Sequence, residues 1–290
     1  MSADGTDRRM LDPRYVAARR VLLDALFALA PHGKAFIVAG AQAVYLRTGL
    51  NDIAIAPYTT DGDLALDPTL LGDDPELGAT MREAGFEQRE QKDQTQPGIW
   101  LRTENVDGDD VIIPIDLIVP EAAASGGGRR GARLGPHGDR AARRAVGLEA
   151  VLVDHDTMTV AALDPNDART IEVEVAGVAA LIVAKAHKIH DRLATGRADR
   201  LSDKDAADVV RIMQTASARE VGATLAGLRQ DAIASAPTET ALRYVADLFG
   251  RRAGDGVAMA QRALRLAVPA EQVATLCVSF TERMLAATYA

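Results

Sequence analysis

The stretch 59–66, TTDGDLAL, places Asp61 and Asp63 at the start of an alternating apolar segment. Asp-Gly is a common two-residue hairpin signal, so one interpretation is a tight turn that opens a strand. In the other, residues two apart on a strand face the same side, so both carboxylates point at one site. Hard divalent cations such as Mg²⁺ bind carboxylates of this kind together with phosphate oxygens.

A third aspartate, Asp116, is embedded in the apolar segment 111–120, VIIPIDLIVP. Burying an unpaired carboxylate is costly, so Asp116 either faces water from an edge strand or meets a partner. Its flanks alternate as in a strand. A strand next to Asp61 and Asp63 would bring the three carboxylates together, and this arrangement favours a metal site.

The segment 36–44, FIVAGAQAV, is typical of a buried strand, a turn at Gly40 and Ala41, and the start of a helix. Backbone amides at a helix N-terminus bind phosphate, and small residues let the phosphate approach closely. A tight strand–helix connection explains the same residues without a ligand.

Strand patterns dominate the middle of the chain and helical patterns its end, which predicts an α+β fold. We expect a mixed-sheet domain over residues 1–176 and an all-helical domain over 177–290. Further helices are expected at 12–30 and at 74–85, with Asp74 as the N-cap of the latter. Strands are expected at 86–91, 99–104, 110–120, 149–154, 157–163 and 169–175, and helices at 178–194 and 203–214 with three or four more behind them.

Composition excludes several classes of protein. The longest uncharged apolar run, residues 175–184, is too short to span a bilayer. The N-terminus lacks the apolar segment of a secretory signal. The one cysteine, Cys277, excludes an internal disulfide and a cysteine-built zinc site. We therefore expect a cytoplasmic protein with no membrane partner.

A glycine-rich basic segment interrupts this acidic chain, whose formal net charge is −8. Residues 126–147 hold six arginines and one acid, and we expect them to form a mobile loop. The loop is either solvated without a partner or contacts the phosphate backbone of RNA. The arginines of the second interpretation are Arg129, Arg130, Arg133, Arg140, Arg143 and Arg144.

Lysines are scarce, and three of the five lie within twenty residues of each other: Lys185, Lys188 and Lys204. Lys185 falls on the apolar stripe of the helix expected at 178–194, so it either snorkels to water or reaches into a cleft. We expect Lys185 to project toward Asp61 and Asp63, and its helix to pack on the sheet that carries them. Truncating Lys185 should therefore cost little packing. Lys188 would lie beside it.

Asp205 and Asp208 lie one helical step apart on the next expected helix, so they face the same way. Ser202 and Asp205 also have the spacing of a capping box, which explains Asp205 without a ligand. In the other interpretation, Asp208 approaches Lys185 from this helix.

The pattern AKxxKxxxR…KDxxDV, which contains Lys185, Lys188, Arg192, Lys204, Asp205 and Asp208, follows the Gly-Ala turn, the Asp-x-Asp pair and the third acid. This order resembles the nucleotidyltransferase toxins of the AbiE (AbiEii) abortive-infection type and the related MenT toxins, within the polymerase-β-like superfamily. The resemblance covers about residues 35–213 as scattered motifs.

The resemblance implies transfer of a nucleotide from a nucleoside triphosphate (NTP), with Mg²⁺ or Mn²⁺ as cofactor, to the 3′ end of tRNA. It also implies a toxin with a cognate antitoxin protein. The implied catalytic residues are Asp61, Asp63, Asp116, Lys185 and Asp208, of which the first three bind metal. The implied nucleotide-binding residues are Gly40, Ala41, Thr60, Lys188, Lys204 and Asp205.

Three alternatives stay open at this point. One is a transferase that modifies a small molecule such as an aminoglycoside, and another is an inactive nucleotide-binding module of the same fold. The third is a zinc site at His187 and Asp191, which have helical i, i+4 spacing.

Overall fold

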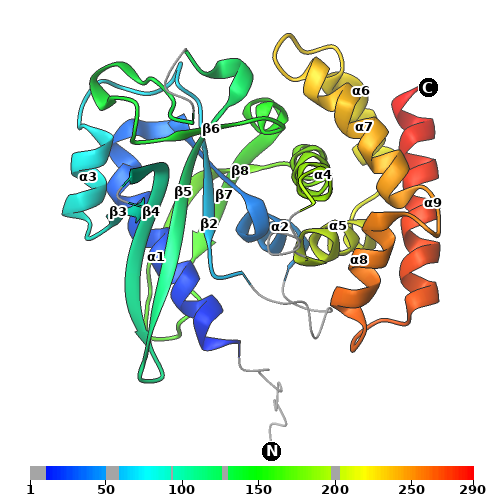
Figure 1. Cartoon of the computed structure of the whole chain (residues 1–290), viewed down its shortest axis with the longest axis horizontal. Helices are drawn as coiled ribbons and strands as arrows, with labels where there is room; N and C mark the ends of the chain where they lie inside the picture. The colour runs from blue at the N-terminus through cyan, green and yellow to red at the C-terminus, as the bar shows by residue number, and fades with distance from the viewer. Residues whose placement is uncertain (1–10, 50–58, 93, 126–129, 197–202) are drawn as a thin grey trace, which may run out of the picture.

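The computed structural model describes residues 11–49, 59–92, 94–125, 130–196 and 203–290. A twisted sheet with its helices forms the first part of the chain, and helices alone form the remainder (Figure 1). This arrangement confirms the expected α+β class with a mixed sheet and a helical C-terminal region.

Eight strands of the described residues form one sheet in the order β3-β4-β5-β2-β1-β8-β7, with β6 beside β5. The pairs β2–β5, β1–β8 and β5–β6 are parallel, whereas the other pairs are antiparallel. The strands are β1 (Phe36–Ala39), β2 (Gly62–Leu66), β3 (Glu87–Gln91), β4 (Gln94–Val106), β5 (Asp109–Pro120), β6 (Arg143–Ala145), β7 (His155–Ala161) and β8 (Thr170–Ala176).

Helices cover the sheet and then continue alone. The first begins at Asp12, whose carboxylate accepts a hydrogen bond from the Arg14 amide, with Pro13 in the first helical position. The helices are α1 (Pro13–Leu29), α2 (Gly40–Thr48), α3 (Leu77–Glu83), α4 (Val178–Ala194), α5 (Asp203–Thr215), α6 (Ala218–Leu228), α7 (Ser235–Phe249), α8 (Asp255–Leu264) and α9 (Ala270–Thr288).

Two local expectations are wrong. Helix α3 is capped by Glu76 rather than Asp74, because the Glu76 carboxylate accepts hydrogen bonds from the amides of Gly78 and Ala79. The segment 149–154 is not the expected strand and begins with the 3₁₀ helix η4 (Glu149–Leu152). The buried Glu149 carboxylate turns this segment, since it accepts a hydrogen bond from the Gly147 amide at 2.7 Å.

The change from strands to helices falls where the sequence indicates it, between the end of β8 at Ala176 and the start of α4 at Val178. One cluster of buried apolar side chains runs through both parts. The division into two domains at this point stays a prediction. Helix α4 packs on α2, α5, α6, α7 and η4, and residues of α4 share a cavity with Asp63 of the sheet. The expectation that α4 packs directly on the aspartate-bearing sheet stays a prediction.

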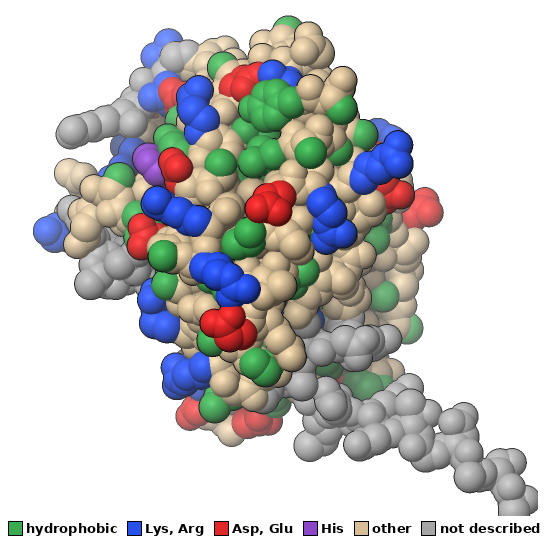
Figure 2. All heavy atoms as spheres, turned by 90° about the vertical axis from the view of Figure 1, so that its right-hand side faces the viewer, with side chains coloured by type: hydrophobic (Ala, Val, Ile, Leu, Met, Phe, Trp, Pro, Cys, Tyr) green, Lys and Arg blue, Asp and Glu red, His purple; other side chains and the backbone are tan. Residues whose placement is uncertain are grey.

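The surface of the helical end carries acidic and basic side chains interspersed with apolar ones (Figure 2). Across the part of the chain that the structure describes, no helix combines the length and apolar character needed to cross a membrane.

Candidate functional site

Asp63 and Asp116 are register partners on the adjacent parallel strands β2 and β5, so their side chains lie side by side on the same face of the sheet. Strand β5 lies between β4 and β2, so the edge-strand alternative for Asp116 is wrong. The hairpin interpretation of Asp61-Gly62 is wrong as well. The strands paired with β2 are β1 and β5, and neither is joined to it by a two-residue loop.

The two faces of β2 have different surroundings. A β-carbon added to Gly62 would lie 2.7 Å from the Ile115 side chain and 3.3 Å from Leu22 of α1, so this side of the strand is packed with apolar groups. Because side chains alternate along a strand, Asp63 faces the opposite side, toward α2 and α4. Asp63 therefore opens on the space between the sheet and the helical part of the chain.

Each of the two outer carboxylates is bonded to a cation. Asp116 accepts hydrogen bonds from Nη2 and Nε of Arg143, at 2.7 and 3.2 Å. The Lys204 ammonium lies 3.8 Å from Asp61, which also accepts a hydrogen bond from the Thr59 hydroxyl. Burial alone would raise the pKa of Asp61, but Lys204 and the Thr59 hydroxyl hold this pKa below its usual range.

The central carboxylate has a different electrostatic environment. Burial raises the pKa of Asp63, and the negative charges of Asp61 and Asp116 raise it further, against the opposing effect of the Lys188 ammonium. The three acids therefore lie within electrostatic reach of one another. Their combined field favours a cation at Asp63.

The donor set fits a hard divalent cation, since it consists of carboxylate oxygens on adjacent strands. The described residues nevertheless contain no group of three His, Cys, Asp or Glu side chains arranged to hold a metal ion. The expected convergence of three carboxylates in one pocket is therefore not met among these residues: Asp116 bonds Arg143, and Asp61 forms an ion pair with Lys204. Metal binding here stays a prediction.

Gly40, the first residue of α2, lies against Asp63. It adopts a left-handed φ of 62°, and a β-carbon at this position would overlap the Asp63 carboxylate. The expected strand, glycine turn and helix are therefore confirmed, and the turn brings the N-terminus of α2 to the acids. Phosphate binding by Gly40, Ala41 and Thr60 stays a prediction.

Lys185 is buried with 3% of its surface exposed, and its ammonium donates to Asp205 at 2.7 Å and to Asp208 at 2.6 Å. Burial would lower the pKa of Lys185, but these two carboxylates outweigh it and hold the pKa above its usual range. The snorkelling interpretation is wrong. The expected projection toward Asp61 and Asp63 stays a prediction: Lys185 lines the same cavity as Asp63 and its charge helps to lower the pKa of Asp61, while its ammonium bonds the acids of α5.

Asp205 joins three cations of α4. Besides Lys185 it contacts Arg192 at 2.5 Å and Lys188 at 3.3 Å. Burial would raise the pKa of Asp205, but the three cations lower it below its usual range. The pairing of a lysine with Asp208 and Asp205 is thus as expected, whereas the capping partner Ser202 lies outside the described residues. Lys188 is the more accessible lysine, with 38% of its side chain exposed.

A cavity of about 470 Å³ lies between Asp63 and the lysines of α4. Gly40 and Asp63 line one part of it, Arg143 and Arg144 of β6 another, and α4 contributes the third. The lining from α4 includes Lys185, Lys188 and Arg192. Several cations around a cavity suit a ligand with multiple negative charges, such as a chain of phosphates.

The basic segment divides into two parts. Arg130, Arg133 and Arg140 are exposed, and Arg129 lies outside the described residues. Arg143 and Arg144 are partly buried on β6, where they pair with Asp116 and Glu121. A mobile loop over the whole of 126–147 is therefore wrong, since β6 pairs with β5 and the Trp100 indole donates to the Ala141 carbonyl.

Sequence reasoning missed Arg143 as the partner of Asp116, although it noted the arginine as part of a basic segment. The zinc alternative also finds no support among the described side chains. His187 bonds the Pro237 carbonyl at 2.9 Å, and His190 stacks on Tyr244. Trp100 is fully buried in the core.

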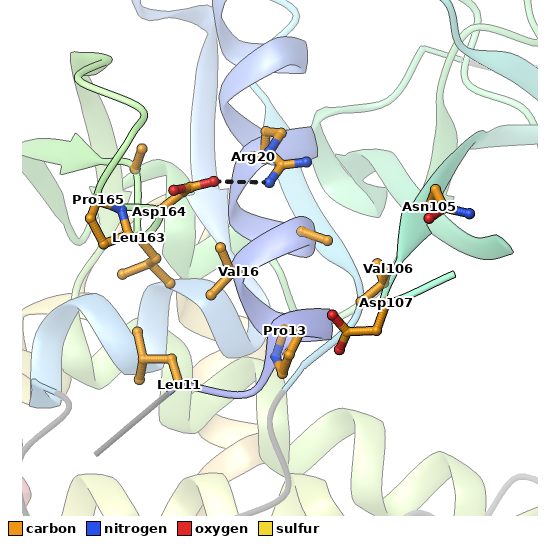
Figure 3. A pocket seen from close by; sticks show the side chains of 12 residues that line it. Leu11, Pro13, Val16, Arg20, Asn105, Val106, Asp107, Leu163, Asp164 and Pro165 are labelled. Carbon is orange, nitrogen blue, oxygen red and sulfur yellow. Dashed lines mark hydrogen bonds and ion pairs between the residues drawn. The ribbon is translucent and has the colours of Figure 1, made fainter. Parts of the chain in front are cut away.

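A second cavity, of about 740 Å³, lies at the N-terminal end of α1 (Figure 3). It shares no lining residue with the first cavity. Apolar side chains such as Val16 and Leu163 line it, and its cation Arg20 points to Asp164, with which it forms an ion pair at 3.2 Å. Arg20 is the one cation among the described residues that line this cavity, whereas five cations and Asp63 line the first, so we place the candidate site at the first cavity.

Comparison with protein-family models gives no match to this chain, and comparison with curated proteins gives none either. The function therefore has to be argued from the site itself.

Proposed function

We propose that this chain is a metal-dependent nucleotidyltransferase that moves a nucleotide from an NTP to an acceptor hydroxyl. The observation that carries the proposal is the register of Asp63 with Asp116 on adjacent parallel strands, where Asp63 lines a cavity that also has five cationic side chains in its walls. Acids on one side and cations on the other suit a metal–triphosphate complex, in which both charges are present.

In the proposed reaction the acceptor hydroxyl loses its proton to solvent and its oxygen forms a bond to the α-phosphorus of the NTP. The bond from this phosphorus to the bridging oxygen breaks, and pyrophosphate leaves. Divalent Mg²⁺ or Mn²⁺, when bound, supplies charge neutralisation along this path. Asp61, Asp63 and Asp116 would hold the ion. Lys188, Lys204 and the arginines of β6 would bind phosphate oxygens, while Asp205 and Asp208 orient Lys185 at the cavity wall.

We propose the 3′ end of tRNA as the acceptor, and with it the role of a cytoplasmic toxin that a cognate antitoxin restrains. The support is the exposed group Arg130, Arg133 and Arg140, which precedes β6 and offers charge for an RNA backbone. A small-molecule acceptor of the aminoglycoside type is the second candidate. An inactive nucleotide-binding module is a third, although all three acids are present at the cavity or beside it.

The test is a transfer assay with each labelled NTP, Mg²⁺ or Mn²⁺, and total RNA. We expect label in the tRNA fraction with the parental protein and none with Asp63→Asn, which keeps the shape of the side chain but removes its charge. Label on an aminoglycoside but not on RNA would show that the acceptor is the small molecule and not tRNA. Equal labelling by the parent and by Asp63→Asn would contradict the assignment of the site.

A further inference from the structure

Arg143 and Asp116 form a two-bond ion pair at the wall of the cavity, through Nη2 at 2.7 Å and Nε at 3.2 Å to the same oxygen, Oδ2. Both side chains are partly accessible, with 29% and 21% of their surface exposed. Arg143 lines the cavity, so a ligand there can compete with Asp116 for its guanidinium.

The backbone that carries Arg143 is fixed. Strand β6 pairs with β5, with Arg143 in register with Ile118, and the Arg144 amide donates to the Arg130 carbonyl. Gly98 packs so closely that a β-carbon there would overlap the Arg143 amide nitrogen. Any change of partner by Arg143 is thus a rotation of its side chain and not a movement of the strand.

Two competing interactions converge on this pair. The guanidinium of Arg143 bonds Oδ2 of Asp116, so a divalent cation that binds this carboxylate would repel it at close range. A phosphate in the cavity offers Arg143 another anionic partner, whose several oxygens can accept from both nitrogens that now share one oxygen of Asp116. Lys188 and Arg192, which also line the cavity, would hold the phosphate chain against the opposite wall.

We propose that Arg143 is exchanged between two partners: it bonds Asp116 in the free protein and the phosphates of the NTP when Asp116 takes up a divalent cation. This inference rests on the proposed function. It makes metal and triphosphate bind cooperatively, because each one releases the partner that the other requires. By linkage, the factor by which one ligand strengthens the other is the same in both directions.

If Arg143 competes with the metal for Asp116, the nucleotide-free protein binds a divalent cation more weakly than a variant in which Asp116 has no guanidinium partner. The experiment is a titration with Mn²⁺ in the absence of nucleotide, followed by electron paramagnetic resonance, on the full chain. Arg143→Gln frees Asp116 and should bind Mn²⁺ about three- to tenfold more tightly than the matched control Arg144→Gln.

Arg144 is a close control because it is the next residue of β6, lines the same cavity and pairs with a different acid, Glu121. Both substitutions remove one positive charge, so the general electrostatic gain cancels in the comparison. Arg143→Lys keeps the charge but cannot make both bonds, and should bind Mn²⁺ with an affinity between those of the parent and Arg143→Gln. Thermal unfolding confirms that each variant is folded.

Equal or weaker binding of Mn²⁺ by Arg143→Gln, relative to Arg144→Gln, would overturn the exchange while leaving the proposed function in place, provided that Asp63→Asn lowers Mn²⁺ affinity. If the parent binds no Mn²⁺ and Asp63→Asn behaves like the parent, both the exchange and the metal-dependent function are wrong. The two failures are therefore distinguishable in one set of titrations.

Discussion

The carboxylate of Asp63 fills the space in which a side chain at Gly40 would lie. The first residue of α2 and the central acid of β2 therefore depend on each other, since the acid keeps its position only while residue 40 has no β-carbon. The contact also explains why the turn between β1 and α2 uses glycine, with its left-handed φ of 62°.

Gly40→Ala should displace Asp63 and abolish both Mn²⁺ binding and nucleotide transfer. Left-handed backbone costs an alanine about 1–2 kcal/mol, so some loss of stability accompanies the change. Gly49→Ala is the control, because Gly49 also has a left-handed φ, but no atom of the described residues lies within 4 Å of a β-carbon added there. Equal loss of activity in both variants at matched folded fractions would show that strain, and not the clash with Asp63, is responsible.

Lys185→Met should lower the free energy of unfolding by about 3–5 kcal/mol, because it leaves the buried carboxylates of Asp205 and Asp208 without their shared cation. Lys188→Met on the same helix should cost about 1 kcal/mol or less, since Lys188 is partly exposed. Urea denaturation measures both. The expectation from sequence, that truncating Lys185 costs little, is therefore reversed.

For activity the order of the two variants should be reversed: among folded molecules, Lys188→Met should impair nucleotide transfer more than Lys185→Met does. Lys188→Met should lose affinity for the NTP, because the partly exposed Lys188 ammonium lines the cavity proposed to hold the phosphates. The neutral set Lys185→Met, Asp205→Asn and Asp208→Asn should recover part of the stability that Lys185→Met loses. A neutral set less stable than the single variant would contradict the buried-charge explanation.

Glu174 on β8 provides a pH-dependent contribution to stability. The Lys34 ammonium, at 2.7 Å, is the main reason that the pKa of Glu174 falls from 4.5 to about 2, with added hydrogen bonds from His155 and Thr157. A carboxyl whose pKa is depressed on folding stabilises the protein above its unfolded pKa, and this stabilisation is lost as the pH falls toward the folded value.

Glu174→Gln should therefore destabilise the protein by about 1–2 kcal/mol at pH 6, with the lower part of the range favoured because Lys34 is largely exposed. The difference from the parent should shrink between pH 4.5 and pH 2. Urea denaturation across this interval gives the measurement. A difference that is constant with pH would mean that shape, and not charge, makes the contribution.

The exposed arginines before β6 can be tested as a group. Replacing Arg130, Arg133 and Arg140 with glutamine should weaken tRNA binding and reduce the slope of log affinity against log salt by up to about 2, or about 0.7 for each phosphate that is no longer neutralised. The control replaces Arg243, Arg251 and Arg265, which are exposed in the helical part. The same slope in both triple variants would make the arginines before β6 bystanders.

Much of the acid site could be predicted because its signals are local. A carboxylate inside a strand pattern needs a polar partner or water, and together with the strand expected at 63–66 this predicts that Asp116 can lie beside Asp63, as it does. Gly40 between a strand and a helix likewise predicts the turn. The helices from 178 onward follow from apolar periodicity, which their buried faces confirm.

The partners of the charges could not be predicted in the same way. Lys185 bonds Asp205 and Asp208 because α5 packs on α4, and no periodic signal tells a lysine which of two acid pairs it meets. The pairing of Arg143 with Asp116 depends on β6, a strand of three residues that carries too little pattern to be recognised. The choice of Glu76 as the cap of α3 depends on competition between neighbouring acids.

The packing of Gly62 against Leu22 and Ile115 gives Asp63 a second role, in folding fidelity. If β2 slipped by one residue against β5, every side chain of the strand would change faces, and the Asp63 carboxylate would enter that apolar contact. An unpaired carboxylate there would cost several kcal/mol, so the sheet with the slipped register would be less stable than the native one by about this amount. The acid proposed for catalysis thus also disfavours the wrong register of the strand that carries it.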